Sequence, residues 1–519
     1  MASFPNSNQG EDKLVFSRSK IIWQVTFDLG SSIEDIKPAA KNLYDSPICR
    51  GLLSYLPPER RDEGVGEIQI KGIQEGGESQ EIKDDTYEHL EAFQKSDFLY
   101  LDEEYFESGQ YARLRLQGIK ILVLGFENYA DVDVYVTLNR YGVAVLSFWM
   151  DIEEPVTSRK LAELQIIPSV EEETLNIKAP IQLIEEYSNL NKELTKVVEA
   201  MKEKGKKSIT MKNKSFSELV WYYVSSVINR VNKMRFSSSE KLSKSLRYEP
   251  YIIYPYVVVL TEVEDKENAI EIVDSHPKQF YQIMAHMKDV EYNVINGDIT
   301  DDLLRPNISE RSDIAYLSTI GSTILLLSKK SQEILAEKAK ENGTSVEYET
   351  LLEIIPGFSA LELLQMQRFL LRFLDFFLTR KNIADMGSGE IMVLKEFMGQ
   401  ALDEFYTIKI VGHRMTHLRL EHGKETMLIN NMFQSIMDKL ELLDSAIESY
   451  EQIRSNFFQI ALTVMLGVVS SVLILSPFEK DLYNSILSLV ITGIITGTAY
   501  FGSDIYWRKM HQRARKMES

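Results

Sequence analysis

Two long uncharged stretches near the C-terminus dominate the hydrophobic pattern of the chain. They cover residues 455–478 and 482–503, and only Glu479, Lys480 and Asp481 separate them. A helix rises about 1.5 Å per residue, so about 20 apolar residues cross a hydrocarbon core of about 30 Å. The pattern predicts two membrane-spanning helices joined as a hairpin. The alternative is a pair of helices buried in the core of a large soluble domain.

Polar and small side chains mark one face of the first predicted span. At about 100° per residue they fall in one narrow sector of the helix: Asn456, Gln459, Thr463, Gly467 and Ser470. Lipid disfavours such a stripe, so several copies of the chain around an axis would line a pore with it. The alternative is that the stripe packs against the second span. At the outer mouth, Glu479 and Asp481 would form cation-attracting rings of carboxylates, or else belong to a merely polar loop.

The charges beside the spans predict their orientation. The segment after the second span carries five basic residues: Arg508, Lys509, Arg513, Arg515 and Lys516. The link between the spans carries only Lys480, and positive charge stays on the cytoplasmic side of a membrane. Both termini are therefore expected in the cytosol, with residues 1–455 as a large cytosolic part.

Alternating and apolar runs in the first 330 residues predict a mixed β-sheet. Strand patterns cover residues 13–27, 112–126 and 251–263, with hairpins at 132–150 (Gly142 at the turn) and 314–329. Between the first two patterns, up to about Asp97, Pro57-Pro58 and Gly76-Gly77 indicate loops. Residues 156–236 have apolar positions at helical spacing and predict a helical excursion. We therefore expect residues 1–330 to form a cytosolic α/β domain.

The pattern changes to helix after residue 330. Residues 360–381 are very apolar, but Arg368, Arg372 and Asp375 interrupt them too often for a third span. Past Gly423, apolar residues recur with the spacing of a coiled coil: Ile429, Phe433, Ile436, Leu440, Leu443 and Ile447. An uninterrupted helix from residue 425 to 475 would run about 75 Å into the striped span. The expected order is a helical region and stalk at 331–455, then the hairpin and basic tail at 456–519.

Composition narrows the functions of the cytosolic part. The 519 residues carry a formal net charge of −19, which argues against binding DNA or RNA polymers, although a local basic patch could still bind a nucleotide. The single cysteine, Cys49, excludes an internal disulfide framework. Residues 1–12 contain no apolar run, so no cleaved signal peptide is expected.

One segment offers candidate ligands for a metal or a phosphate. His413 and His417 stand four residues apart and could hold a metal from one helix face. Arg414, Arg419 and Lys424 could instead bind a phosphate, and a solvated helix face is the third interpretation. We find no nucleophile constellation, paired-carboxylate motif or dinucleotide fingerprint, so the chain is not expected to be an enzyme.

The order of these elements resembles the CorA family of magnesium transporters. A cytosolic α/β domain precedes helices, a long stalk helix, two spans and a basic tail, and the likeness in sequence lies mainly in residues 425–519. The resemblance implies a homo-oligomer, a pentamer, in the lipid bilayer of the bacterial cytoplasmic membrane. It also implies that the first span lines the pore and that Mg²⁺ or another divalent cation passes through it. The family's outer loop begins with Gly-Met-Asn, where this chain reads Leu475-Ser-Pro-Phe-Glu-Lys.

Without that signature, the chain is more similar to the divergent CorA-like proteins found beside type III CRISPR systems. Those proteins are thought to be membrane effectors switched on by a nucleotide second messenger, including adenylated S-adenosylmethionine. The resemblance implies a channel for antiviral defence that a small nucleotide opens. Two alternatives remain: a divalent-cation transporter gated by intracellular metal, and a membrane-anchored signalling scaffold that conducts nothing.

Overall fold

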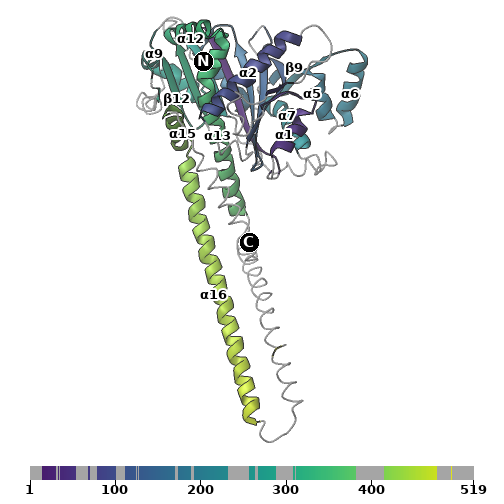
Figure 1. Cartoon of the computed structure of the whole chain (residues 1–519), viewed down its shortest axis with the longest axis vertical. Coiled ribbons are helices and arrows are strands. Elements are labelled where there is room, and N and C mark those ends of the chain that lie inside the picture. Colours follow the sequence, from purple (N-terminus) through teal and green to yellow (C-terminus); the bar gives the residue numbers. More distant parts are fainter. Residues whose placement is uncertain are drawn as a thin grey trace, which may run out of the picture. The chain divides into compact units, whose positions relative to one another are not determined.

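The computed structural model of the chain (Figure 1) describes most of the residues up to Leu475. The described residues are 14–30, 33, 36–53, 68–70, 79–100, 111–123, 126, 128–169, 174–188, 192–231, 256–263, 267–287, 308–309, 311–380, 414–475 and 493. The chain divides into two compact units. The first comprises Met1–Leu371 and Glu404–Asn430, and the second comprises Arg372–Asp403 and Asn431–Ser519.

An eleven-stranded sheet forms the centre of the first unit. Nine strands follow one another in the order β10-β9-β5-β6-β7-β2-β11-β13-β12, while β3 pairs with β5 and β4 with β3. β11 and β13 pair in parallel and the other neighbours are antiparallel, which confirms the predicted mixed sheet. The strands are β2 (Arg18–Asp28), β3 (Cys49–Leu53), β4 (Ile68–Ile70), β5 (Tyr111–Leu122), β6 (Ala130–Asn139), β7 (Val143–Ile152), β9 (Thr174–Pro180), β10 (Ser208–Ser215), β11 (Tyr256–Val263), β12 (Ile314–Ser318) and β13 (Ser322–Ser328).

Helices and one small sheet complete the described elements. β1 (Val15–Phe16) and β8 (Val156–Thr157) pair with each other. The helices are α1 (Ile36–Tyr44), α2 (Ser79–Tyr100), α4 (Ser158–Ile166), the 3-10 turn η2 (Ile167–Ser169), α5 (Ile181–Ser188), α6 (Lys192–Glu203), α7 (Phe216–Val231), α9 (Ala269–Ser275), α10 (Pro277–Met284), α12 (Lys329–Asn342), α13 (Val346–Arg380), α15 (Arg414–Thr426) and α16 (Ile429–Leu475).

Both predicted hairpins are present in the sheet. β6 and β7 form the first, and Gly142 at its turn has a φ of 81°. This left-handed backbone costs glycine little because it has no Cβ atom, which explains the residue at this position. β12 and β13 form the second hairpin, with Ser318 opposite Thr323 beside the turn.

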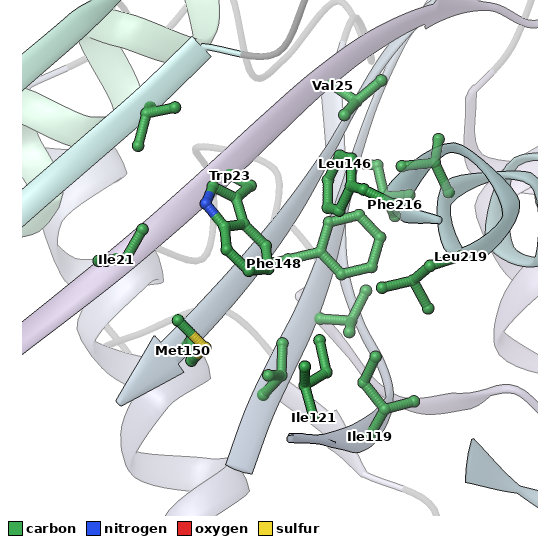
Figure 2. Packing of buried hydrophobic residues seen from close by; sticks show 14 of the residues in the cluster. Ile21, Trp23, Val25, Ile119, Ile121, Leu146, Phe148, Met150, Phe216 and Leu219 are labelled. Carbon is green, nitrogen blue, oxygen red and sulfur yellow. The ribbon is translucent and has the colours of Figure 1, made fainter. Parts of the chain in front are cut away.

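One face of the sheet is apolar and carries the main core. Trp23 of β2 and Phe148 of β7 both pack edge-on against Phe216 of α7, with ring centroids 5.2 and 5.5 Å apart (Figure 2). Further residues of this core come from α1, α4, α5, α9 and α10. Each fully buried large apolar side chain contributes about 1.5–3 kcal/mol, so this face supplies most of the hydrophobic stabilisation of the unit.

The opposite face of the sheet is polar but also buried, beneath α2 and α13. Arg113 and Arg115 of β5 alternate with Leu114 and Leu116, and all four side chains are buried. The leucines join the apolar core, whereas the arginines reach carboxylates on the covering helices and on β6. The sheet therefore has apolar packing on one side and, on the other, a network of paired charges beside aromatic rings such as Phe93 and Trp149.

The polar zone up to about Asp97 contains a helix that the sequence did not predict, α2 at residues 79–100, whereas the predicted loops at Pro57-Pro58 and Gly76-Gly77 lie outside the described residues. α2 contains neither glycine nor proline over its 22 residues, so nothing in it interrupts a helix. Leu90 and Phe93 are fully buried, three residues apart on one helix face.

The predicted helical excursion over residues 156–236 is correct only in part. α4, α5, α6 and α7 are helices, but β9 and β10 interrupt them and extend the sheet to its edge. β9 buries alternate residues, Leu175, Ile177 and Ala179, as a strand with one covered face does. The two strands contain asparagine, lysine and proline, which have low strand preference, so their strand signal is weak.

The expectation of helix after residue 330 is confirmed for the described residues, with one difference. The uninterrupted helix expected from residue 425 is wrong at its start, because α15 ends at Thr426 and α16 begins at Ile429. Leu428 between them has a φ of 59°, a left-handed conformation that cannot continue a helix. From Ile429 onward, α16 runs for 47 residues without a break.

Part of the predicted membrane hairpin lies outside the described residues. Among the residues that the structure describes, no helix combines the length and the apolarity needed to cross a membrane. The predicted second span lies outside the described residues except for Gly493, and so do Glu479, Asp481 and the basic tail.

Candidate functional site

A buried ionic cluster around Arg113 fastens α2 and α13 to the sheet. The Nη2 atom of Arg113 lies 2.6 Å from Oε2 of Glu362 on α13 and 3.6 Å from Oδ2 of Asp97 on α2. Nη1 donates a hydrogen bond of 3.1 Å to Oγ1 of Thr137, and the Ser359 hydroxyl donates one of 2.6 Å to Asp97. One guanidinium therefore links two helices that are more than 250 residues apart in the sequence.

Burial sets the electrostatics of this cluster. Desolvation raises the pKa of the Asp97 and Glu362 carboxyl groups, although Arg113 opposes the shift in both. The two negative charges raise the pKa of Arg113 further above its usual value, against desolvation. Removing one member of such a buried group leaves the others unpaired, which is costly, so the cluster holds its helices in one arrangement.

A second ionic cluster lies on the same face around Arg115. Its Nη2 atom lies 2.7 Å from Oδ1 of Asp133 on β6 and 3.0 Å from Oδ2 of Asp85 on α2. His89 of α2 belongs to the same cluster: its Nε2 is 3.2 Å from Oδ1 of Asp85 and its Nδ1 is 2.5 Å from the Tyr135 hydroxyl. Burial and the Arg115 charge lower the pKa of His89 to about 4, so this imidazole is neutral at pH 7.

Lys20 of β2 connects this second cluster to the start of α13. Its ammonium lies 3.2 Å from Oδ1 of Asp151 on β7 and 3.2 Å from Oε1 of Glu347 on α13. These carboxylates raise the pKa of Lys20 even though burial is the largest influence and lowers it. α13 is thus tied to the sheet by ion pairs at Glu347 and at Glu362, four helical turns apart.

α13 and α15 approach each other closely at two glycines. A Cβ atom on Gly423 would lie 2.2 Å from Cδ1 of Leu364, and one on Gly357 would lie 2.9 Å from Nη1 of Arg419. Arg419 also lies over the ring of Tyr316, 4.9 Å from its centroid. The missing side chains of these glycines therefore create the space that lets the two helices touch.

The residues predicted to bind phosphate are already engaged here. Arg419 packs on Tyr316 as described, and Lys424 is buried with its ammonium 2.9 Å from Oε1 of Glu421. The side chain of Arg414 lies outside the described residues. Arg419 therefore joins α15 to β12, whereas the Lys424–Glu421 pair lies within α15.

The histidines predicted as metal ligands gain no further partners in the described part of the chain. His413 lies outside it and His417 is exposed. Within the ranges that the structure describes, no three His, Cys, Asp or Glu side chains come together as a metal site would need.

The predicted pore-lining residues lie on the far part of α16. Asn456, Gln459, Thr463 and Gly467 are exposed in the single chain, and the Thr463 hydroxyl donates a hydrogen bond of 2.7 Å to the Gln459 carbonyl. The side chain of Ser470 lies outside the described residues. These four positions are therefore accessible to solvent in the single chain.

The predicted apolar seam of the stalk is buried at Ile429, Ile436 and Leu440 and half-buried at Phe433. Ile429 and Ile436 are fully buried and Leu440 is 8% exposed, already within one chain. Lys439 on the same helix forms an ion pair of 2.5 Å with Asp375 near the end of α13. The side chains of Leu443 and Ile447 lie outside the described residues.

A cleft of about 250 Å³ lies at the ends of β5, β6 and β7. Two aromatic side chains, Phe126 and Tyr129, line it, together with carboxylates that include Asp131, Glu153 and Glu154. A concave site with aromatic walls and a few polar groups is the usual form of a small-molecule site. The sequence did not predict this cleft because its walls come from the ends of three strands. The only sequence signal was the run from Phe126 to Asp131 between two predicted strands.

Comparison of the chain with protein-family models, with curated proteins and with solved structures gave no match.

Proposed function

We propose that the protein is a ligand-gated, oligomeric membrane channel of CorA-like architecture. One observation carries the proposal: the 47 residues of α16 form a single helix. Its first two residues, Ile429 and Asn430, belong to the first unit and the rest to the second. One uninterrupted helix therefore links the folded first unit to the uncharged stretch predicted to enter the membrane. A movement at its start reaches its end without passing a flexible joint.

The side chains near the C-terminal end of α16 support the proposal that this part of the helix contacts lipid or protein as well as water. Phe458 and Ile460 are 50% and 60% exposed in the single chain. Large apolar side chains clustered on a surface mark contacts with membrane or protein. Asn456, Gln459 and Thr463 lie among them, and the side-chain amides of Asn456 and Gln459 need hydrogen-bonding partners. An oligomer that turns the apolar side chains to lipid and the polar ones to a central pore satisfies both sets.

The partners in this proposal are the lipid bilayer, further copies of the same chain and a small nucleotide. Five copies are expected from the CorA-like arrangement, in a bacterial cytoplasmic membrane with both termini in the cytosol. The nucleotide opens the pore, and the resemblance to the effectors beside type III CRISPR systems assigns the channel to antiviral defence. No catalytic step is needed for this role.

Cysteine labelling tests the pore. In a Cys49→Ser background, reconstituted in liposomes, Thr463→Cys and Ser470→Cys are expected to react with a small water-soluble thiol reagent. Val464→Cys and Val468→Cys serve as matched controls outside the polar sector and should stay unreactive. Equal labelling on both faces, or on neither, would show that the stripe is packing surface.

Ion flux separates the channel from a scaffold that conducts nothing. Liposomes that contain the wild-type protein are expected to release trapped cations in the presence of the nucleotide. Thr463→Trp should block the release because the indole fills the pore, whereas Val468→Trp should leave it largely intact. Liposomes that release no cations under any condition would exclude the channel.

A further inference from the structure

Two lysines face each other on an exposed part of the sheet. Lys120 of β5 stands directly opposite Lys178 of β9, and Thr210 of β10 is the next partner along the row. Both lysine side chains are exposed, and they lie on the same face of the sheet as the buried Arg115. Like charges directly opposite each other destabilise a strand pair. Acidic residues are in excess in this chain, whose net charge is −19. Two lysines at directly facing positions therefore suggest a function.

The charges around this pair are unequal. Lys120 lies 2.8 Å from Asp131 of β6 and is 49% exposed. Among the described residues, the side chain of Lys178 has no ion-pair or hydrogen-bond partner. An anion that lies over the two ammonium groups would relieve their repulsion and give Lys178 a partner.

The lysine pair borders the aromatic cleft. Asp131, which pairs with Lys120, also lines the cleft. Adjacent strands lie about 4.8 Å apart, so the step from β6 through β5 to β9 covers about 10 Å. The cleft itself is acidic and the lysine margin is basic. Together they fit a ligand with an anionic end and, at the other end, a flat group rich in amines and hydroxyls.

The cleft has the surfaces that a nucleobase needs. The ammonium of Lys160 lies 4.9 Å from the centroid of Phe126, so one face of this ring already holds a cation. Tyr129 is 38% exposed and can stack on a base. The Asn128 amide donates a hydrogen bond of 3.4 Å to Glu154, and both groups can bond to a base edge or to ribose hydroxyls.

We infer that this cleft and the Lys120–Lys178 pair form one nucleotide site, with the base beside Tyr129 and the phosphate on the lysines. The inference rests on the proposed function, because it gives that function its ligand site. The site is also connected to α2. Asp133, two residues from Asp131 on the same strand, pairs with Arg115, whose cluster reaches Asp85 of α2.

The test measures binding by the full chain in detergent with three probes: ATP, adenosine and pyrophosphate. Wild-type protein is expected to bind ATP most tightly. Lys120→Ala/Lys178→Ala should weaken ATP at least about tenfold, since charge-assisted hydrogen bonds contribute about 1.5–3 kcal/mol each. It should abolish the binding of pyrophosphate and leave that of adenosine unchanged. Lys340→Ala, an exposed lysine on α12, is the matched control and should have no effect.

The aromatic wall is tested in the same way. Tyr129→Ala should weaken both ATP and adenosine by about fivefold or more, because stacking a base on an aromatic ring contributes about 1–3 kcal/mol. Tyr87→Ala, which removes a tyrosine 45% exposed on α2, is the control. If ATP binds but neither variant weakens it, the site is wrong and the channel proposal stands. If none of the three probes binds wild-type protein, the ligand class assigned to this site is wrong. The cysteine labelling of α16 then decides the channel by itself.

Discussion

Burial beside the guanidinium of Arg115 keeps His89 uncharged down to a pKa of about 4, compared with 6.5 for a free imidazole. Between these two values the unfolded chain binds a proton at this residue and the folded chain does not. The free energy of unfolding therefore rises as the pH rises from about 4 to 6.5, and this contribution to stability is lost as the pH falls through the same window. The shift corresponds to roughly 3 kcal/mol.

His89→Gln should flatten this part of the pH profile. Urea midpoints can be followed by the fluorescence of the buried Trp23 and Trp149 at pH 4.5 and 7. The loss of stability between the two pH values should be clearly smaller in the variant than in the wild type. An identical loss in both proteins would mean that other groups cause the pH dependence.

Arg113 is the residue whose removal should cost most on the polar face. Arg113→Gln leaves Glu362 and Asp97 buried without a cation, and breaking such a pair costs about 3–5 kcal/mol. The double variant Arg113→Met/Glu362→Leu removes both charges of the main pair and should recover much of that loss. Urea unfolding of both variants checks this, and equal instability of the two would contradict the ionic explanation.

At the scale of elements, the contact between α13 and α15 depends on the absence of a side chain at Gly423. Gly423→Ala should cost about 1–3 kcal/mol because the new methyl group collides with Leu364. Leu364→Ala alone leaves a cavity and should cost about 2–5 kcal/mol. In the double variant the methyl group enters that cavity, so the combined loss in urea unfolding should be smaller than the sum. Strict additivity would show that the two residues do not share the space.

Sequence reasoning predicted those elements whose signal is local. The alternation around Arg113 and the turn at Gly142 suffice for strands and a hairpin, because period and turn chemistry act over a few residues. The burial of the polar face could not be predicted, since Arg113 meets Glu362 from a helix far along the chain. For the same reason the cleft beside Tyr129 was missed. The break at Leu428 has no sequence signal, because leucine is normally a strong helix former.

At the scale of the whole molecule, the stalk offers a matched pair of leucines that test assembly. Leu442 is 69% exposed in the single chain, whereas Leu440 is 8% exposed. If copies of the chain associate along α16, Leu442→Glu should dissociate the oligomer in detergent and leave the unfolding of each chain unchanged. Leu440→Glu should instead destabilise the chain itself, because it buries a charge. Native mass spectrometry measures the first effect. An unchanged oligomer mass for Leu442→Glu would exclude this face from the contact between copies.

The length of α16 also has a mechanical consequence. Its 47 residues measure about 70 Å at about 1.5 Å per residue. A tilt of about 5° at the first turn then displaces the far end by about 6 Å, close to one helical pitch of about 5.4 Å. In such a tilt the helix would act as a lever arm pivoting beside Leu428, a single residue in a left-handed conformation. A tilt of this size at the first turn therefore displaces Leu475 by more than the diameter of a water molecule.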